Sequence, residues 1–232
     1  MSQAHAQTVV ITGATGHVGK ALVGHLRGKA PLALLGQDLA RLTPMLADEA
    51  RVALISDVDV NDEQSVLAGV ERARRALGPL RALVHTVGTW AGGSEVEEQP
   101  LAGVRKLFDL NFFSAVHLVK AVLPDIKASG QGRIVLFGSA DALRARAGSA
   151  AYAASKAALL RFAEALAEEV ASAHVGVHVI LPTTIDTPAN RSAMPGAKVE
   201  NWVSLEEVAN AVEFALSPAS SGLRFATLPL GR

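Results

Sequence analysis

Three side chains that could exchange a proton with a substrate stand at a spacing that would bring them together. Ser139 precedes Tyr152 by thirteen residues, and Lys156 follows Tyr152 by one helical turn. The alanine-rich segment from Tyr152 to Lys156 favours a helix, so the phenol and the ammonium project from one face. A free tyrosine has a pKa of about 10, and a nearby cation lowers that pKa by stabilising the phenolate. The sequence therefore predicts that Tyr152, the only tyrosine, acts as a general acid or base.

A glycine-rich turn follows the first apolar run of the chain. Residues 8–12 form a short β-branched run, and the segment Gly13-Ala-Thr-Gly16-His-Val-Gly19 comes directly after it. Gly13 permits a tight turn, Gly16 lets the backbone approach a pyrophosphate, and Gly19 allows a helix to pack closely on the strand. The unpaired amides at the start of the next helix would point at the phosphate. This pattern predicts a dinucleotide-binding unit.

Composition narrows the class of protein and its partners. The 22 basic residues balance 22 acidic residues, so there is no electrostatic case for nucleic acid or anionic membranes. The absence of cysteine excludes disulfides and thiolate metal sites, and the histidines lack metal-ligand spacing, so we expect no metal. The N-terminus lacks the features of a signal peptide, and we expect no apolar run long enough to span a bilayer. We predict one cytoplasmic domain over residues 1–232.

Strand-like runs alternate with helix-like runs along the whole chain. The expected strands are Thr8–Thr12, Leu32–Leu35, Val52–Ser56, Ala82–Thr86, Arg133–Phe137, Val177–Leu181 and Phe225–Leu228. The expected helices are Gly19–Arg27, Leu39–Leu46, Asp62–Leu77, Gly103–Ser129, Ala151–Ala173 and Leu205–Leu216. Continuous apolar strands separated by helices predict an α/β fold of the Rossmann type, a doubly wound parallel sheet of about seven strands with helices on both faces. Ligands then bind at the carboxyl ends of the strands.

With these motifs, the chain resembles the short-chain dehydrogenase/reductase family over essentially its full length. The resemblance implies four catalytic residues: Asn111, Ser139, Tyr152 and Lys156. It implies that Tyr152 gives a proton to the developing oxyanion, Ser139 steadies the carbonyl oxygen, and Lys156 also holds the nicotinamide ribose. Asn111 would anchor a proton-relay water through its backbone. The implied reaction is hydride transfer between a nicotinamide and a small-molecule carbonyl or alcohol.

The same resemblance implies a set of cofactor-binding residues. They are Gly13, Thr15, Gly16, Val18, Gly19, Gly36, Gln37, Asp59, Val60, Gly88, Tyr152, Lys156, Pro182, Ile185 and Thr187. Asp59 and Val60 match the pair that contacts adenine. Two segments depart from the family pattern: His85-Thr-Val-Gly88 replaces Asn-Asn-Ala-Gly, and the segment 182–187 replaces a Pro-Gly turn. His85 itself is expected to be a satisfied core or cofactor-side residue rather than a base.

The choice between NADP(H) and NAD(H) depends on the end of the second strand. An acid there would accept hydrogen bonds from the ribose of NAD and repel a 2′-phosphate, but the chain has Gly36 at that position. We expect no arginine after this strand that would bind the phosphate, and Asp38 could restore a preference for NAD. The sequence slightly favours NADP(H) over NAD(H).

Several alternatives stay open. Segments 88–93 and 181–195 are similar to the dihydropteridine reductases, although that subgroup lacks the catalytic serine and carries an acid after the second strand. A quinonoid dihydropteridine reductase or a non-catalytic dinucleotide sensor is therefore an alternative function. Arg144 and Arg146 could favour an anionic substrate or lie in a solvated loop. Residues 186–201 could form a substrate lid, and the long apolar helices suggest a homodimer or homotetramer.

Overall fold

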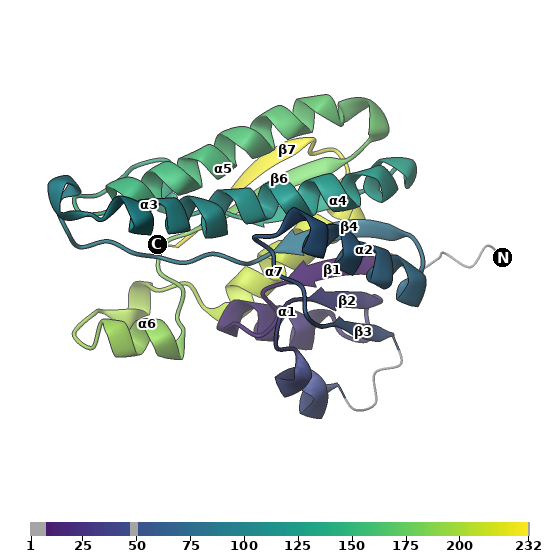
Figure 1. Cartoon of the computed structure of the whole chain (residues 1–232), viewed down its shortest axis with the longest axis horizontal. Coiled ribbons are helices and arrows are strands. Elements are labelled where there is room, and N and C mark those ends of the chain that lie inside the picture. Colours follow the sequence, from purple (N-terminus) through teal and green to yellow (C-terminus); the bar gives the residue numbers. More distant parts are fainter. Residues whose placement is uncertain (1–7, 47–50, 232) are drawn as a thin grey trace.

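Seven strands form one parallel sheet in the order β3-β2-β1-β4-β5-β6-β7 (Figure 1). The computed structural model describes residues 8–46 and 51–231. The strands are β1 (Thr8–Thr12), β2 (Leu32–Leu35), β3 (Val52–Ile55), β4 (Leu80–His85), β5 (Arg133–Phe137), β6 (Gly176–Pro182) and β7 (Phe225–Leu230). Each expected strand is present, with its ends displaced by two residues at most. The order reverses at β1, which has β2 on one side and β4 on the other, and this is the topological switch point of a doubly wound sheet.

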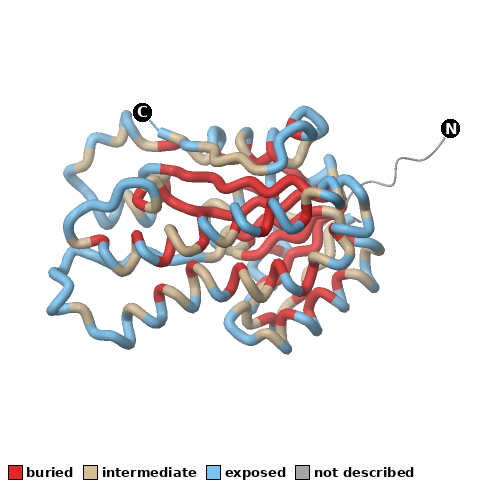
Figure 2. Tube along the Cα trace, turned by 90° about the horizontal axis from the view of Figure 1, so that it is seen from above, coloured by how far each residue is buried: buried red, intermediate tan, exposed pale blue. Residues whose placement is uncertain are grey.

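Helices cover both faces of the sheet. They are α1 (His17–Leu26), α2 (Glu63–Leu77), α3 (Leu101–Phe108), α4 (Ser114–Ala128), α5 (Ala150–Glu169), α6 (Pro188–Ala193) and α7 (Leu205–Leu216). One core cluster joins α2, α4 and α5 to the sheet, and a second joins α1 and α7 to the opposite face. Because both faces are covered, the central strands are buried along their length (Figure 2). The predicted Rossmann-type fold is confirmed.

Three expected helices differ from the structure. The segment expected as Leu39–Leu46 forms a 3₁₀ helix, η1 (Ala40–Met45), because Pro44 lies inside it and only short runs of this type are stable. The segment expected as Ala151–Ala173 ends its α-helix at Glu169 and continues as a separate 3₁₀ turn. The third, expected as Gly103–Ser129, is α3 and α4 joined by a π-helical segment, η3 (Asp109–Phe113).

Helices α3 and α4, joined by η3, correct the expectation that no apolar run is long enough to span a bilayer. Leu101–Ala128 is a helical run of 28 residues that is apolar enough to cross a membrane by length and composition alone. The sequence alone did not indicate this run, because polar residues such as Asp109 and Asn111 interrupt its apolar pattern. Within the fold α4 packs against α2 and β4, and 44% of the most apolar window is buried. Through α4, the run thus covers one face of the sheet.

Candidate active site

The carboxyl end of β5 and the first turns of α5 bring the predicted proton-transfer residues together. Ser139 follows β5 and is buried, while Tyr152 and Lys156 lie one turn apart on α5. The Ser139 hydroxyl lies near enough to the Tyr152 phenol to lower its pKa, and it accepts a hydrogen bond of 3.2 Å from the backbone amide of Asp141. This last bond fixes the position of the serine oxygen next to the phenol.

The electrostatics of Tyr152 differ from the expectation. Burial raises the pKa of the phenol above its ordinary value of 10.0, and the charge of Asp141 acts in the same direction. The Ser139 hydrogen bond and the Arg146 charge lower it. Lys156 instead donates a hydrogen bond of 2.7 Å to the carbonyl oxygen of Phe137. The expected lowering of the Tyr152 pKa by Lys156 is therefore not found in this arrangement, since the ammonium is held by the end of β5.

Lys156 is one of the few buried cations of the domain. Its side chain is nearly inaccessible, and burial lowers its pKa from 10.5 to about 8. Gly88, after β4, lies directly against it. A Cβ on Gly88 would lie 3.0 Å from Lys156 Nζ and 2.9 Å from Asn111 Oδ1. Glycine at this position thus lets three predicted site residues approach one another.

Asn111 lies in the π-helical segment between α3 and α4. Its side chain accepts a bond of 2.8 Å from the amide of Thr89 and donates one of 2.9 Å to the Thr89 carbonyl. Nδ2 also donates to Ser155 Oγ at 3.0 Å, which in turn donates to the Tyr152 carbonyl. Single π turns inside α-helices are frequent at functional sites. Sequence reasoning missed Ser155, because its partner Asn111 lies far away in the chain.

His85 is a structural residue, as expected. The Ser114 hydroxyl donates to the Leu110 carbonyl at 2.7 Å, so it accepts from His85 Nε2 at 3.0 Å. Nδ1 of the ring then accepts from the Thr12 hydroxyl at 2.7 Å. Burial lowers the His85 pKa to about 3, with Lys156 adding to the effect. The imidazole is therefore neutral and bridges β1, β4 and the start of α4.

The glycine turn has the geometry predicted for it. Gly13 adopts a φ of 75°, and a Cβ on it would lie 2.4 Å from Thr86 Oγ1. A Cβ on Gly19 would lie 2.1 Å from the Gly13 carbonyl oxygen, so only glycine permits this packing of α1 on β1. Helix α1 begins after Gly16 without a side-chain cap. The first backbone amides of α1 are therefore available to bind a ligand, and this arrangement fits the phosphates of a dinucleotide.

Beside this turn lies a cavity of about 340 Å³ at the ends of β1, β2 and β3. Its lining includes five of the predicted cofactor residues besides the first glycine: Thr15, Gly36, Gln37, Asp59 and Val60. Arg41 lines it too and donates to the carboxylate of Asp38. The expectation that no arginine follows β2 was wrong, because η1 returns Arg41 to the end of the strand. The donors and apolar walls fit the adenosine half of a dinucleotide.

The remaining predicted cofactor residues lie elsewhere. Val18 and Ile185 pack against the core on the α1 and α7 face. Pro182 ends β6, and Thr187 caps α6 by accepting from the amide of Asn190. The segment 186–201 contains α6 and a 3₁₀ turn, and Figure 1 shows α6 standing away from the sheet. A parallel β-bridge joins Ile185, just before this segment, to Val203, just after it.

Arg146 has a partner that the sequence did not indicate. It forms two hydrogen bonds of 3.0 Å with the carboxylate of Asp141, which is buried beside Ser139. Arg144 is exposed. Both arginines are exposed, as expected for a solvated loop, and only Arg146 is held next to the proton-transfer group by its ion pair with Asp141.

Comparison with known proteins agrees with this geometry. The model of the short chain dehydrogenase family matches residues 7–198. The chain is 30% identical to the 1-deoxy-11-beta-hydroxypentalenate dehydrogenase of Streptomyces avermitilis, over 90% of this chain and 80% of that one. The chain belongs to the short-chain dehydrogenase/reductase family, and it is an NAD(P)-dependent oxidoreductase.

Solved structures share the fold. A blue fluorescent protein from a metagenomic library, in complex with NADPH, has a TM-score of 0.85 and 25% identity, covering 99% of this chain and 98% of that one. An NAD⁺-bound xylitol dehydrogenase has a TM-score of 0.86 and 22% identity, covering 99% of both chains. Proteins of this fold thus occur with either dinucleotide.

Proposed function

We propose that this protein interconverts a small-molecule carbonyl and its alcohol, with Tyr152 as the proton donor and acceptor. The observation that carries the proposal is the meeting of the Ser139 and Tyr152 hydroxyls beside Lys156 and Asn111. This group lies at the same edge of the sheet as the glycine turn. When bound, a nicotinamide dinucleotide supplies or accepts the hydride.

The chain's own residues then have separate roles. Burial keeps Tyr152 protonated near neutral pH, so the phenol is ready to donate to an oxyanion. Ser139, fixed by the Asp141 amide, holds the substrate oxygen within reach of the phenol. Lys156, one turn from Tyr152 on α5, carries a positive charge below about pH 8. Asn111 fixes the loop at Thr89, and we assign the backbone of its π turn the role of anchoring a water that resupplies protons.

We further propose that NADP(H) is preferred. The favourable feature is Arg41, which lines the cavity at the end of β2, where a 2′-phosphate would lie. Asp38 already binds the Arg41 guanidinium, so its carboxylate is partly neutralised. Gly36 provides no acid that would repel the phosphate.

The test is an absorbance assay of nicotinamide oxidation with NADPH and NADH in parallel. Cyclic and acyclic carbonyl compounds and a quinonoid dihydropterin serve as substrates. Tyr152→Phe is expected to lower turnover by about 10²- to 10⁴-fold, the usual contribution of a general acid. Its affinity for the cofactor, followed by fluorescence, should stay within a few-fold of wild type.

Each outcome separates the candidates. Turnover confined to the pterin would identify a dihydropteridine reductase. Cofactor binding without turnover on any substrate would favour the dinucleotide sensor. A Tyr152→Phe variant that retains full activity would contradict the role of the phenol.

A further inference from the structure

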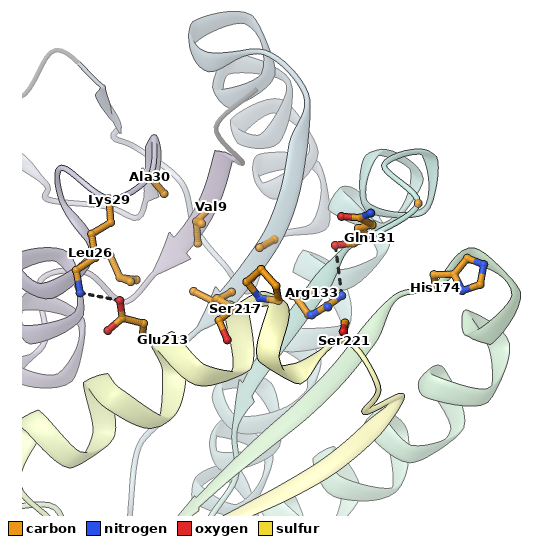
Figure 3. A pocket seen from close by; sticks show the side chains of 14 residues that line it. Val9, Leu26, Lys29, Ala30, Gln131, Arg133, His174, Glu213, Ser217 and Ser221 are labelled. Carbon is orange, nitrogen blue, oxygen red and sulfur yellow. Dashed lines mark hydrogen bonds and ion pairs between the residues drawn. The ribbon is translucent and has the colours of Figure 1, made fainter. Parts of the chain in front are cut away.

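A cavity larger than the one beside the glycine turn lies at the opposite edge of the sheet. It has a volume of about 710 Å³ and opens between the sheet, the end of α1 and the segment after α7 (Figure 3). Its floor is a row of residues paired in register across three strands: Val9, Ala82 and Arg133. Paired residues of parallel strands point to the same face of the sheet. Residues near the N-terminal ends of β1, β4 and β5 therefore build this floor.

Arg133 is a buried cation without a counter-ion. Only 6% of its surface is exposed, and among the described residues it forms no ion pair with a carboxylate. Burial lowers the pKa of its guanidinium, and the neighbouring charge that adds to this effect is another cation, Arg81. A buried charge is costly unless it is paired. The site therefore favours an anion.

The hydrogen bonds of Arg133 leave one terminal nitrogen free. Nε donates to Ser220 Oγ at 3.2 Å, and Nη1 donates to the carbonyls of Gln131 and Gly132 at 3.3 and 2.7 Å. These bonds tie the start of β5 to the turn after α7. Within the described chain Nη2 has no partner, and it is not one of the fully enclosed side-chain nitrogens. A purely structural role explains Nε and Nη1 but leaves Nη2 and the net charge unexplained.

The residues next to Arg133 add no negative charge to compensate it. His178, on β6, is fully buried, and both of its ring nitrogens lack a partner among the described residues. The His178 and Arg133 side chains converge over Gly176, where a Cβ would lie 3.0 Å from His178 Nε2 and 3.2 Å from Arg133 Cδ. Lys29 and Glu213 also line the cavity, and their charges compensate each other in an ion pair with an Nζ–Oε1 distance of 2.7 Å. The cavity thus carries one uncompensated positive charge.

We propose that this cavity binds a small organic acid, with Arg133 Nη2 holding its carboxylate and an apolar body lying along the walls. The walls are largely apolar and include Leu26, Ala30, Leu216 and Pro218. Clefts of 300–1,000 Å³ with apolar walls and a few fixed polar groups are typical ligand sites. A single guanidinium matches a monoanion, because the charges of Lys29 and Glu213 already compensate each other (Figure 3).

The test is calorimetric titration of the full-length protein, without dinucleotide, with sodium octanoate and with octanamide as the uncharged probe. Octanoate should bind at least about tenfold more tightly than octanamide, because only the carboxylate accepts a charge-assisted hydrogen bond. Arg133→Met should remove this difference, whereas Arg105→Met, at an exposed arginine of α3, should keep it. Equal binding of the two probes, or unchanged octanoate binding by Arg133→Met, would overturn the proposal.

A second variant keeps the test valid if Arg133→Met does not fold, since that change also breaks the bonds to the turn after α7. Ala30→Trp would fill the cavity without touching Arg133, and it should weaken octanoate binding at least about tenfold. Ala102→Trp, at an exposed position of α3, is its matched control. Tyr152→Phe should bind octanoate like the wild type, because Tyr152 lies at the opposite edge. Octanoate binding that Ala30→Trp leaves intact, or that Tyr152→Phe abolishes, would place the ligand elsewhere and overturn the proposal.

Discussion

At the scale of single residues, the candidate active site contains a buried lysine, and its burial has a cost in stability. Burial lowers the pKa of Lys156 from 10.5 to about 8. Between these pH values the unfolded chain binds a proton at this residue and the folded protein does not. Stability linked to Lys156 is therefore lost as pH falls from about 10.5 to about 8. Near neutrality the buried ammonium costs roughly 3 kcal/mol at most.

Lys156→Met should accordingly raise the free energy of unfolding at pH 7, by up to roughly 2–3 kcal/mol, while it impairs catalysis. The gain over wild type should shrink toward pH 10. Urea denaturation at both pH values measures it, with Lys127→Met at an exposed position of α4 as the control. A Lys156→Met variant less stable than wild type at pH 7 would show that the bond to Phe137 outweighs the burial of the charge.

A second residue-scale prediction concerns Arg41. Because it lines the cavity at the end of β2, Arg41→Ala should weaken NADPH binding by about 10- to 100-fold, the usual effect of losing a hydrogen bond to a charged group. NADH binding should change far less. Asp38→Asn, which removes the competing carboxylate, should strengthen NADPH binding. Fluorescence titration with both cofactors measures these affinities. Equal losses of affinity for NADPH and NADH in Arg41→Ala would count against a phosphate-binding role.

At the scale of elements, β6 carries a polar residue that its surroundings do not satisfy. His178 is fully inaccessible, its ring nitrogens have no partners among the described residues, and burial lowers its pKa to about 4. The unfolded chain protonates this residue below about pH 6.5, whereas the folded protein keeps it neutral. Stability is therefore lost as pH falls from about 6.5 toward 4.

His178→Leu should stabilise the protein by about 1–3 kcal/mol at pH 7, since it removes unsatisfied polar atoms from the core. The gain should be larger at pH 5. Thermal and urea unfolding at both pH values test this, and His17→Leu, at an exposed position, should change little. Destabilisation at pH 7 would mean that the imidazole packs better than leucine.

At the scale of the whole molecule, the α3–α4 run offers a surface for self-association. Leu101 and Phe113 are 64% and 46% exposed, although both are large and apolar. Phe113 stacks edge-on against Phe112, which in turn packs against Phe162 of α5. We propose that copies of this chain pair across the α3–α4 run and the neighbouring α5 to form a homodimer or homotetramer.

Light scattering at micromolar concentration should therefore give a mass at least twice that of one chain. Phe113→Glu should shift the protein toward the monomer by placing a charge in the contact. Glu200→Gln, on the distant 3₁₀ turn after α6, should leave the mass unchanged. A wild-type monomer at this concentration would contradict the assembly.

The sequence alone predicted the alternation of strands and helices, because local composition and periodicity indicate where most elements lie. It also indicated the glycine turn and the Ser139, Tyr152 and Lys156 set, since each depends on short spacings within one or two elements. Gly13 and Gly19 have the close contacts that their positions in the turn suggested.

Tertiary structure decided what depends on groups distant in the chain. The fold returns Arg41 to the end of β2, places Asp141 against Arg146, and directs Lys156 to the Phe137 carbonyl instead of the phenol. The uncompensated charge of Arg133 likewise follows from burial and from the register of β4, β5 and β6. Burial and hydrogen-bond partners set these charges and pKa values, and only the packed chain determines which groups are buried and which partners they meet.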